Sequence, residues 1–284
     1  MFFRRKKNIP DGLWKRCDGC KSVVYKKQVD EKHNVCPECN HHFRISTYER
    51  INIILDKGSF EEYWNDMMPA DPLNFKDRIK YKDRIESEQK KTNLNEAATV
   101  GKGLIEGKEV IFGVTDSTFI MGSMGSVVGE KITRAAEKAR ELWLPLIIIS
   151  GSGGGARMHE GAISLMQMAK TCAAISRMQD AGLLFISVLT DPTLGGVMAS
   201  FASQADIIMA EPGALVGFAG PRVIKETIKK TLPKGFQSSE SMLKHGFIDI
   251  IAERSRLRPE ISKILDYCNV NRSNLPAALR RRHG

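Results

Sequence analysis

The chain has 284 residues, a formal net charge of +10 and a hydrophobic content of 42%, which gives room for one large domain and a small module. No apolar run approaches the ~20 residues that a membrane-spanning helix needs, and no apolar stretch follows the charged first residues. We therefore expect neither a membrane protein nor a secretory signal, and a cytoplasmic location. The excess of positive charge favours an anionic partner, either nucleic acid or a phosphate-bearing cofactor.

Residues 1–45 contain four of the six cysteines, as Cys17-x2-Cys20 and Cys36-x2-Cys39 with fifteen residues between the pairs. Two such pairs can close a tetrahedral shell of thiolates around one Zn²⁺, each pair forming one knuckle. A metal with four protein ligands has no open position, so the zinc is expected to be structural rather than catalytic. Without the metal this segment has too little apolar surface to fold alone.

The predicted zinc ribbon is also basic. Residues 1–45 carry eleven Lys or Arg against five Asp or Glu, a net +6 that a zinc ion with four thiolates lowers to about +4. Such a module can bind nucleic acid, although the aromatic side chains available to stack on bases are few, chiefly Trp14, Tyr25 and Phe43. Packing against the main domain is the alternative role, and the sequence leaves both open.

Residues 46–97 are strongly charged and are predicted to form a helical connecting region. Ser46 and Thr47 are candidate N-caps of a first helix, which Gly58 is expected to end. Charges of both signs alternate over residues 76–91, which predicts a second helix with a solvated face.

From residue 98 to residue 284 the pattern changes to strands that alternate with helices. The predicted elements are two strands that turn at Gly107, a helix over residues 130–142, strands at 145–150, 183–189 and 206–210, and a last helix that begins at Pro259. This alternation indicates an α/β fold with largely parallel strands. The strand at 145–150 is continuously apolar, as in strands that are buried on both faces.

A glycine-rich turn, Gly151-Ser-Gly-Gly-Gly-Ala-Arg157, follows that apolar strand. It lacks the downstream acidic residue of a dinucleotide-binding fold and the Lys-Ser/Thr of a P-loop. We predict that a helix begins near Ala156, so that free backbone N–H groups at its N-terminus form an oxyanion hole for a thioester enolate. Arg157 would then oppose the helix dipole, which indicates a separate task such as an ion pair or a phosphate contact.

Four motifs carry a resemblance to a known family: GSMGSVVGEK (122–131), SGGGARMHEG (152–161), LTDPTLGGV (189–197) and EPGALVGFAGPRVI (211–224). Together with the ribbon they resemble β subunits of acetyl-CoA carboxylase carboxyltransferase, over nearly the whole chain. The resemblance implies a crotonase-like (ClpP/crotonase) spiral of ββα units with an N-terminal four-cysteine zinc ribbon. It implies transfer of a carboxyl group from carboxybiotin, on the biotin carboxyl carrier protein, to acetyl-CoA. The product is malonyl-CoA, in the first committed step of fatty acid synthesis.

The resemblance also implies roles for individual residues. Gly154 and Gly155 would donate to the thioester oxygen as the enolate forms. This glycine run is one residue richer than the S-x-S-G-G-A-R usual in the family, so the donors are placed at the pair nearest the predicted helix. The other implied substrate-binding residues are Gly122, Ser123, Met124, Gly125, Arg157, Gly195, Gly196, Phe218, Ala219, Gly220, Pro221 and Arg222.

The implied partners follow from the division of the reaction. The chain contains one crotonase-like unit, whereas the reaction needs sites for both acyl-CoA and carboxybiotin. Phe218–Arg222 would lie where a homologous α subunit contributes the carboxybiotin half of the site, in an α2β2 assembly. Biotin carboxylase and the carrier protein would complete the enzyme.

The motifs contain no Ser-His-Asp set and no clustered pair of carboxylates. Carboxyl transfer explains this, because carboxybiotin can release CO2 in place and its ureido nitrogen can then deprotonate the acetyl methyl group. The protein then needs mainly positioning and oxyanion stabilisation. His159 is therefore interpreted as a packing or solvent-facing histidine rather than a general base, and Cys172 and Cys268 as buried, inert thiols.

Two other functions remain to be weighed. One is a crotonase-type subunit of another biotin-dependent system, such as a malonate decarboxylase, against which the four-cysteine ribbon argues. The other is a zinc-ribbon nucleic-acid-binding protein, against which, as a sole function, the glycine-rich turn argues.

Overall fold

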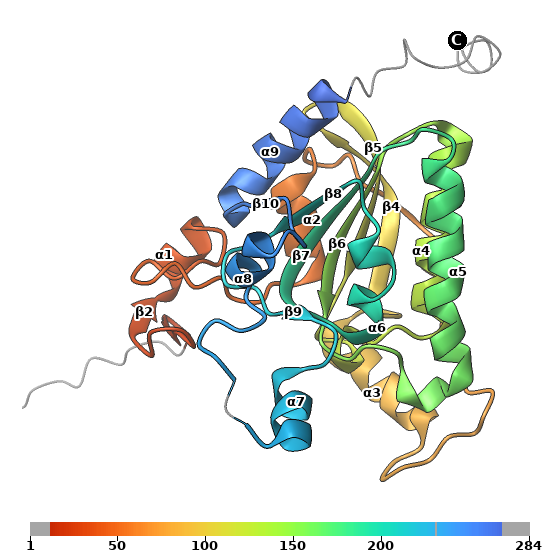
Figure 1. Ribbon diagram of the computed structural model, residues 1–284, viewed down its shortest axis with the longest axis horizontal. Coiled ribbons are helices and arrows are strands. Elements are labelled where there is room, and N and C mark those ends of the chain that lie inside the picture. Colours follow the sequence, from red (N-terminus) through yellow and green to blue (C-terminus); the bar gives the residue numbers. More distant parts are fainter. Residues whose placement is uncertain (1–11, 231, 269–284) are drawn as a thin grey trace, which may run out of the picture. The chain divides into compact units, whose positions relative to one another are not determined.

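The structure is a computed structural model that describes residues 12–230 and 232–268 (Figure 1). The chain divides into two compact units, Met1–Ile45 and Ser46–Gly284, and each has a core of its own. Among the described residues, no helix combines the length and the apolar character needed to cross a bilayer.

The first unit is a small module built on a hairpin. Strands β1 (Trp14–Arg16) and β2 (Val23–Tyr25) pair antiparallel and lead into α1 (Lys26–Glu31). The buried side chains of this unit are Cys17, Val24, Val29, Cys36 and Phe43. A core of five residues, two of them cysteines, is too small to hold such a module folded, so a bound metal is needed to supply the rest.

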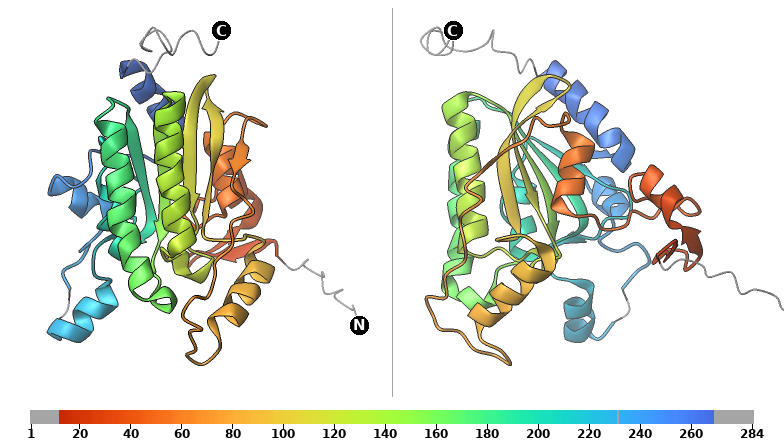
Figure 2. Two further views of the ribbon diagram at one scale, coloured as in Figure 1. Left: turned by 90° about the vertical axis from the view of Figure 1, so that its right-hand side faces the viewer. Right: turned by 180° about the vertical axis from the view of Figure 1, so that it is seen from behind.

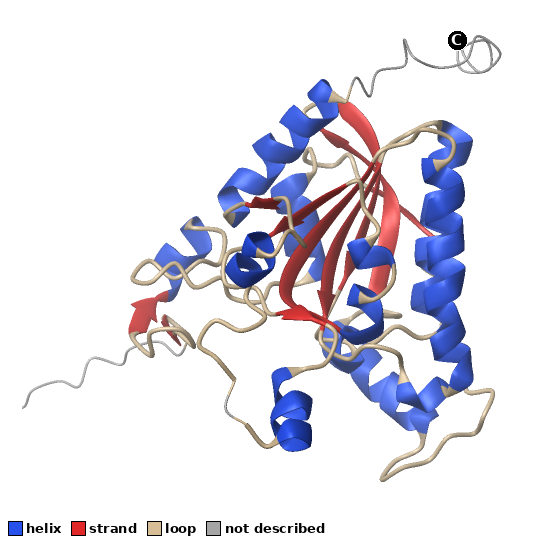
Figure 3. Ribbon diagram, in the orientation of Figure 1, coloured by secondary structure: helices blue, strands red, loops and turns tan. Residues whose placement is uncertain are grey.

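The second unit is built on one mixed sheet, which Figure 3 draws in red. Its strands are β3 (Glu61–Tyr63), β4 (Ala98–Ile105), β5 (Lys108–Thr115), β6 (Leu146–Ser152), β7 (Phe185–Leu194), β8 (Ile207–Ala210), β9 (Val216–Gly217) and β10 (Ile250–Ile251). The order is β10-β8-β7-β6-β5-β4-β3, and β9 pairs with β7. The strands from β5 to β10 are parallel, whereas β3, β4 and β5 pair antiparallel.

Helices cover both faces of the sheet. On one face lie α4 (Ser126–Leu142) and α5 (Ala162–Gln179), side by side in Figure 2, and on the other lie α2 (Thr47–Ile54) and α9 (Arg254–Tyr267). Strand β6 shows why both faces are apolar. Leu146 and Ile148 point into the core under α4 and α5, whereas Ile147 and Ile149 point into the other core. The expected burial of this strand on both faces is confirmed.

Shorter helices connect these elements. They are α3 (Tyr81–Thr92), α6 (Gly195–Met198), α7 (Pro221–Ile228) and α8 (Ser239–Lys244), with 3-10 turns at Ile120–Gly122, Met158–Glu160 and Phe201–Ser203. The first predicted cap is confirmed, because Ser46 accepts from the backbone N–H of Glu49 and the Glu49 side chain accepts from Ser46 in return. The predicted turn between β4 and β5 is also confirmed at Gly107.

Four expected helix boundaries are wrong. Helix α2 ends at Ile54 rather than at Gly58, and α4 begins at Ser126 rather than at residue 130. Helix α3 begins at Tyr81, not at residue 76, and α9 begins at Arg254, so that Pro259 lies inside the helix instead of opening it. The first turns of α9 are held by tertiary contacts: Arg254 pairs with the buried Glu211, and Leu257 lies in the core. These contacts outweigh the local preference of proline for a helix start.

The predicted helix start near Ala156 is also wrong. Ala156 forms an isolated parallel bridge with Met124, a 3-10 turn follows, and α5 begins only at Ala162. In this bridge the N–H of Met124 donates a hydrogen bond to Gly155 O at 2.7 Å, and the N–H of Arg157 donates one to Met124 O at 3.0 Å. These bonds hold Ala156 and Arg157 in a bridged, non-helical segment, which no local signal in the sequence indicates.

Candidate functional site

The candidate site lies at the carboxyl ends of three neighbouring parallel strands. Strands β5, β6 and β7 adjoin in the sheet, so the loops that follow them meet at one edge, a frequent location of ligand sites in α/β folds (Figure 1). These loops contain the glycines that the sequence motifs single out. The loop after β5 ends with Gly122–Gly125, the one after β6 contains Gly153–Gly155, and β7 runs directly into Gly195.

The loop after β5 packs directly against the glycine run after β6. The N–H groups of Gly153 and Gly154 donate to Met121 O at 2.8 and 3.0 Å, and Gly155 O accepts from Met124. The Ser152 hydroxyl donates to Gly122 O at 2.6 Å. The expected proximity of these two loops is therefore present. However, the N–H of Gly154 is already bonded, so one of the two expected oxyanion donors is not free.

The glycine pair after β7 meets the glycine run backbone to backbone. A Cβ atom added to Gly195 would lie 2.7 Å from the Cα of Gly155, and one added to Gly155 would lie 3.3 Å from the N of Gly196. Both Gly155 and Gly195 have a positive φ, at 58° and 63°. Close approach and left-handed backbone together explain why glycine occupies both positions.

Free amide groups lie on both sides of this junction. In the part of the chain that the structure describes, the N–H groups of Gly155, Ala156 and Gly196 have no hydrogen-bond acceptor. Gly196 lies in the first turn of α6, where helical N–H groups have no acceptor within the helix. Two segments therefore bring unused backbone donors to one place, which is what stabilisation of an oxyanion requires. The free donors come from the Gly155–Ala156 segment and from the start of α6, not from the start of α5.

The segment Phe218–Arg222 begins at this junction and then leads away from it. Phe218 O accepts from the N–H of Gly195 at 2.8 Å, and the Phe218 side chain is 68% exposed. Ala219 O accepts from the side chain of Gln237. Pro221 and Arg222 open α7, which has no buried residue, and the Arg222 guanidinium pairs with Glu226 of the same helix. Gly220 lies against Leu194, since an added Cβ atom would be 3.7 Å from that side chain.

Arg157 lies immediately behind the junction, fully buried, and makes the expected ion pair. Its guanidinium binds the carboxylate of Glu96 through two hydrogen bonds of 2.5 and 2.6 Å. Burial lowers the pKa of Arg157, but the adjacent Glu96 carboxylate more than offsets this and the net effect raises it. A direct contact between Arg157 and a CoA phosphate is excluded in this arrangement because the side chain is inaccessible.

Sequence reasoning missed the residues that surround Arg157. Tyr81 donates to Glu160 Oε1 at 2.8 Å, and Glu160 Oε2 accepts from the N–H of Ser126, the first residue of α4. Burial raises the pKa of Tyr81. One local signal in the sequence is related to this network, namely the glycine at position 125. An added Cβ atom there would lie 2.5 Å from Glu160 Oε1, so a side chain at this position would displace the carboxylate.

His159 has the packing role expected of it. Its ring stacks on Tyr81 at 4.9 Å and meets Phe75 edge-on at 5.3 Å, and the residue is 8% exposed. Burial, and then the positive charge of Arg84, lower its pKa. Cys172 is half-buried, and burial raises the pKa of its thiol. The expected burial of Cys268 is wrong, since this residue is exposed at the end of α9.

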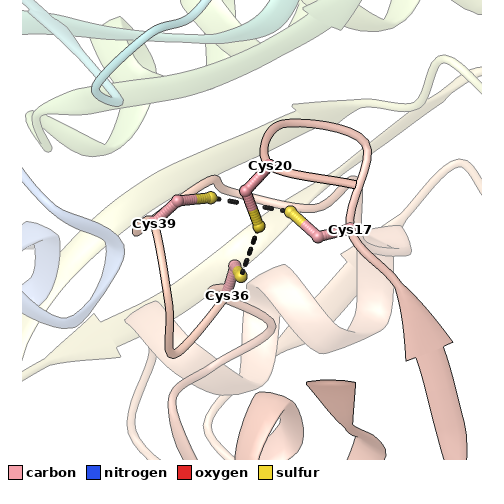
Figure 4. Close-up of side chains that lie close together, drawn as sticks. All are labelled: Cys17, Cys20, Cys36 and Cys39. Atoms are coloured by element: carbon pink, nitrogen blue, oxygen red, sulfur yellow. Dashed lines mark hydrogen bonds between the residues drawn. The ribbon is translucent and has the colours of Figure 1, made fainter. Parts of the chain in front are cut away.

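The four cysteines of the first unit form a compact cluster (Figure 4). The Sγ atoms of Cys17 and Cys39 are 3.6 Å apart, those of Cys20 and Cys36 are 3.9 Å apart, and all four lie within 4.8 Å of one another. A tetrahedral ion at ~2.3 Å from each sulfur places the sulfurs about 3.8 Å apart, so the cluster fits Zn²⁺.

The two cysteine knuckles have the same backbone pattern. The N–H of Cys17 donates to Ser22 O and the N–H of Cys36 donates to His41 O, at 2.8 and 2.9 Å. Each turn thus presents its two sulfurs in the same way, as expected for a zinc ribbon, and the site is closed by protein ligands.

Two family profiles match the sequence. The carboxyl transferase domain matches residues 44–280, and the acetyl-CoA carboxylase zinc finger domain matches residues 14–39. Together they span both compact units.

Similar proteins match most of this chain. The chain is 56% identical over 264 residues to the acetyl-coenzyme A carboxylase carboxyl transferase subunit beta of Rhodopirellula baltica, covering 93% of this chain and 85% of that protein. It is 54% identical over 260 residues to a protein of Clostridium tetani named as the carboxyl transferase subunits beta/alpha, covering 90% of this chain and 44% of that longer one.

Among solved structures, transcarboxylase 12S with methylmalonyl-coenzyme A and methylmalonic acid bound is similar, with a TM-score of 0.65 and 24% identity. The match covers 78% of this chain and 41% of that one. It confirms the expected crotonase-like α/β fold.

Proposed function

The chain belongs to the family of acetyl-CoA carboxylase carboxyl transferase β subunits, and on that premise we propose that it provides the acyl-CoA half of a divided active site. It is a transferase that moves a carboxyl group to an acyl-CoA. We propose acetyl-CoA as the acceptor and malonyl-CoA as the product. The carboxyl group comes from carboxybiotin on the biotin carboxyl carrier protein, which biotin carboxylase loads, and the reaction takes place in the cytoplasm.

The observation that carries this proposal is the junction of the two glycine pairs. The Gly155–Ala156 segment and Gly196 bring free backbone N–H groups together where the backbones touch. An enolate oxygen that develops from a thioester carbonyl carries negative charge, and fixed amide dipoles stabilise this charge without reorganisation. Ala156 joins Gly155 as a proposed donor in place of Gly154.

The chemistry requires no catalytic side chain at this junction. The N–COO⁻ bond of carboxybiotin breaks to give CO2 and an anionic ureido nitrogen. This nitrogen takes a proton from the acetyl methyl group, and the resulting enolate carbon attacks CO2 to form malonyl-CoA. The residues at the junction, Gly155, Ala156, Gly195 and Gly196, have no ionisable side chain. The nearby Arg157 and Glu160 are buried and bonded to protein groups.

We propose that α7 and Phe218 contact an α subunit, in an α2β2 assembly. Helix α7 projects from the rest of its unit in Figure 1 and has no buried residue, and Val223 and Ile228 on it are 57% and 51% exposed. Exposed apolar side chains of this size are typical of protein interfaces. The similar protein of Clostridium tetani is named for both subunits, so the two halves can be parts of one chain in a relative.

We propose that the cysteine cluster holds one structural Zn²⁺ per chain. With four sulfurs at tetrahedral spacing there is no place for a substrate on the metal, so its role is to hold residues 14–43 folded.

A second candidate function, nucleic acid binding by the ribbon, has one observation in its favour. Trp14 is 54% exposed on a basic module and lies against Tyr25, with the rings 5.6 Å apart. An exposed ring of this kind can stack on a base. Filter binding across a salt titration tests this function, and an affinity that does not fall steeply with salt would exclude it.

The main proposal is tested by carboxyl transfer in the reverse direction. The zinc-loaded chain is mixed with a candidate α subunit, malonyl-CoA and a biotin derivative, and acetyl-CoA formation is followed. Biotin-dependent formation of acetyl-CoA is the expected result. No turnover by the folded mixture would leave the fold in place but contradict the proposed substrates.

A further inference from the structure

A buried network of charged and polar side chains lies directly behind the two glycine pairs. Its centre is the guanidinium of Arg157, and Glu96, Tyr81 and Glu160 surround it, all at most 1% exposed. We infer that Arg157, held by Glu96, is a positioning residue that fixes the direction of the free amide of Ala156. This inference rests on the proposed function, since it assigns a task in the oxyanion site to a residue that touches no substrate.

Every donor of the guanidinium is used. Its five hydrogen bonds go to Ser123 Oγ at 3.1 Å, Tyr81 Oη at 3.1 Å, Glu96 Oε2 at 2.5 Å, Glu96 Oε1 at 2.6 Å and Ser123 O at 2.7 Å. A guanidinium has five N–H donors in a rigid plane, so its position is fully determined by these partners. The ammonium of a lysine has three donors and lacks the planar geometry of a guanidinium, so it could not make the same five hydrogen bonds.

The network reaches the Ala156 amide through the loop after β5. Arg157 holds Ser123 through its side chain and Met124 through its own backbone N–H, which donates to Met124 O at 3.0 Å. The N–H of Met124 in turn donates to Gly155 O at 2.7 Å. Loss of the guanidinium contacts therefore loosens the segment that fixes the Gly155 carbonyl.

The Gly155 carbonyl and the Ala156 N–H belong to one planar trans peptide group, so they point in opposite directions. Because Met124 holds the carbonyl on one side, the N–H must point to the other. That side faces α6: a Cβ atom added to Gly196 would lie 3.4 Å from the N of Ala156. The hydrogen bond from Met124 to the Gly155 carbonyl therefore orients the free N–H of Ala156 toward α6.

The far side of the network is anchored on the scaffold. Glu96 Oε1 also accepts from the N–H of Ala97, next to the first residue of β4, at 2.6 Å. Tyr81 links Arg157 to Glu160, which caps α4 by accepting from Ser126. The donor segment is therefore anchored to the sheet and to α4, a helix of 17 residues packed on it. This is the kind of rigid support that precise oxyanion geometry needs.

A purely structural role for the ion pair is the competing explanation, and the chain offers a matched control. Arg254 and Glu211 form a second buried pair, 1% and 2% exposed by residue, with two hydrogen bonds of 2.8 Å, and Arg50 also donates to Glu211 Oε1 at 2.8 Å. This pair joins α9 to the residue after β8, whereas Arg157 bonds to the loop that holds the glycine run. Replacement of either arginine by lysine should cost stability to a comparable degree, but only Arg157→Lys should change the geometry of the oxyanion donors.

The experiment compares Arg157→Lys, Tyr81→Phe and Arg254→Lys in the assembled enzyme. We measure kcat, the KM for malonyl-CoA and the melting temperature, and normalise activity to the folded fraction. The expected result is a kcat about 10- to 100-fold lower for Arg157→Lys, because a displaced oxyanion donor acts on the transition state. Its KM should stay within about threefold of the wild-type value. Arg254→Lys should keep its kcat within about threefold.

Tyr81→Phe keeps the volume of the side chain and removes only the hydroxyl, so it tests the same network if Arg157→Lys does not fold. A kcat that is severalfold lower at unchanged KM supports the inference. An unchanged kcat in every folded Arg157 or Tyr81 variant, or a loss in Arg254→Lys that matches the loss in Arg157→Lys, overturns it.

A readout without turnover separates this inference from the proposed function. Hydrogen–deuterium exchange of the peptide that contains residues 153–158 should be faster in Arg157→Lys and Tyr81→Phe than in the wild type and in Arg254→Lys. If the wild-type enzyme transfers no carboxyl group, the proposed function fails, and the exchange rates alone decide whether Arg157 fixes this segment. Equal exchange in all four proteins overturns the positioning role.

Discussion

Individual glycines define the candidate site more than any side chain does. Gly155 and Gly195 come from different loops, both have a positive φ, and their backbones touch. The sequence showed that glycines cluster in the motifs but not which amide groups stay free. Gly154 was expected to be a donor, and its N–H is bonded to Met121 O instead. That bond depends on the position of a loop from the neighbouring strand, which no local pattern encodes.

Substitution of Gly195 by alanine should lower kcat about 100-fold. The added Cβ atom would lie 2.7 Å from the Cα of Gly155 and would push the two donor segments apart. Gly182→Ala is the matched control, because Gly182 also has a positive φ, at 79°, but its Cβ atom would meet nothing within 4 Å. The control should lose about 1 kcal/mol of stability and keep its kcat. Equal losses of kcat in both variants would show that backbone strain alone explains the effect.

His159 should make the protein sensitive to mild acid. Its pKa is lowered in the folded state, mainly by burial, so below the ordinary histidine pKa of ~6.5 the unfolded chain binds a proton that the folded one does not. Stability should therefore be highest above pH ~6.5 and fall as the pH decreases. His159→Phe keeps the stacking on Tyr81 and should lose less stability than the wild type between pH 7 and 5 in denaturant titrations. A stability difference that does not change with pH would contradict this.

At the scale of the elements, tertiary contacts moved the boundaries that local signals predict. The strand pattern of β6 and the cap of α2 were predicted correctly because periodicity and capping are local. The start of α5 was not, because the bridge between Met124 and Ala156 keeps Ala156 and Arg157 out of the helix. Tyr81 lies in the stretch 76–91 that was expected to have a solvated face, and Glu96 follows that stretch; the burial of both follows from the buried guanidinium of Arg157 that they surround.

Helix α7 should be part of the contact with the α subunit. Val223→Ser combined with Ile228→Ser removes two exposed apolar side chains from this helix and should weaken the assembly about tenfold without a change in melting temperature. The dissociation constant can be measured by sedimentation. Tyr267→Ser is the control, since Tyr267 is 73% exposed on α9. An assembly as tight as that of the wild type would exclude α7 from the interface.

At the scale of the whole molecule, the two units should depend on zinc differently. Removal of the metal by a chelator should unfold residues 14–43, whose core has five residues, and leave the second unit folded on its own two cores. Limited proteolysis with mass spectrometry should then show early cuts only in the first unit. Cys36→Ser should lose the zinc, whereas Cys268→Ser, which changes an exposed thiol outside the cluster, should retain it. Full protease resistance after chelation would contradict the structural role of the metal.

We propose that this chain contributes one half of a divided carboxyl transferase site. The most direct measurement is the rate of carboxyl transfer from malonyl-CoA to a biotin derivative as α subunit is titrated into a fixed amount of the zinc-loaded chain. A divided site predicts no transfer by either chain alone and a rate that rises to a plateau at one α subunit per chain. Transfer by this chain alone at the plateau rate would show that the site is complete without a partner subunit.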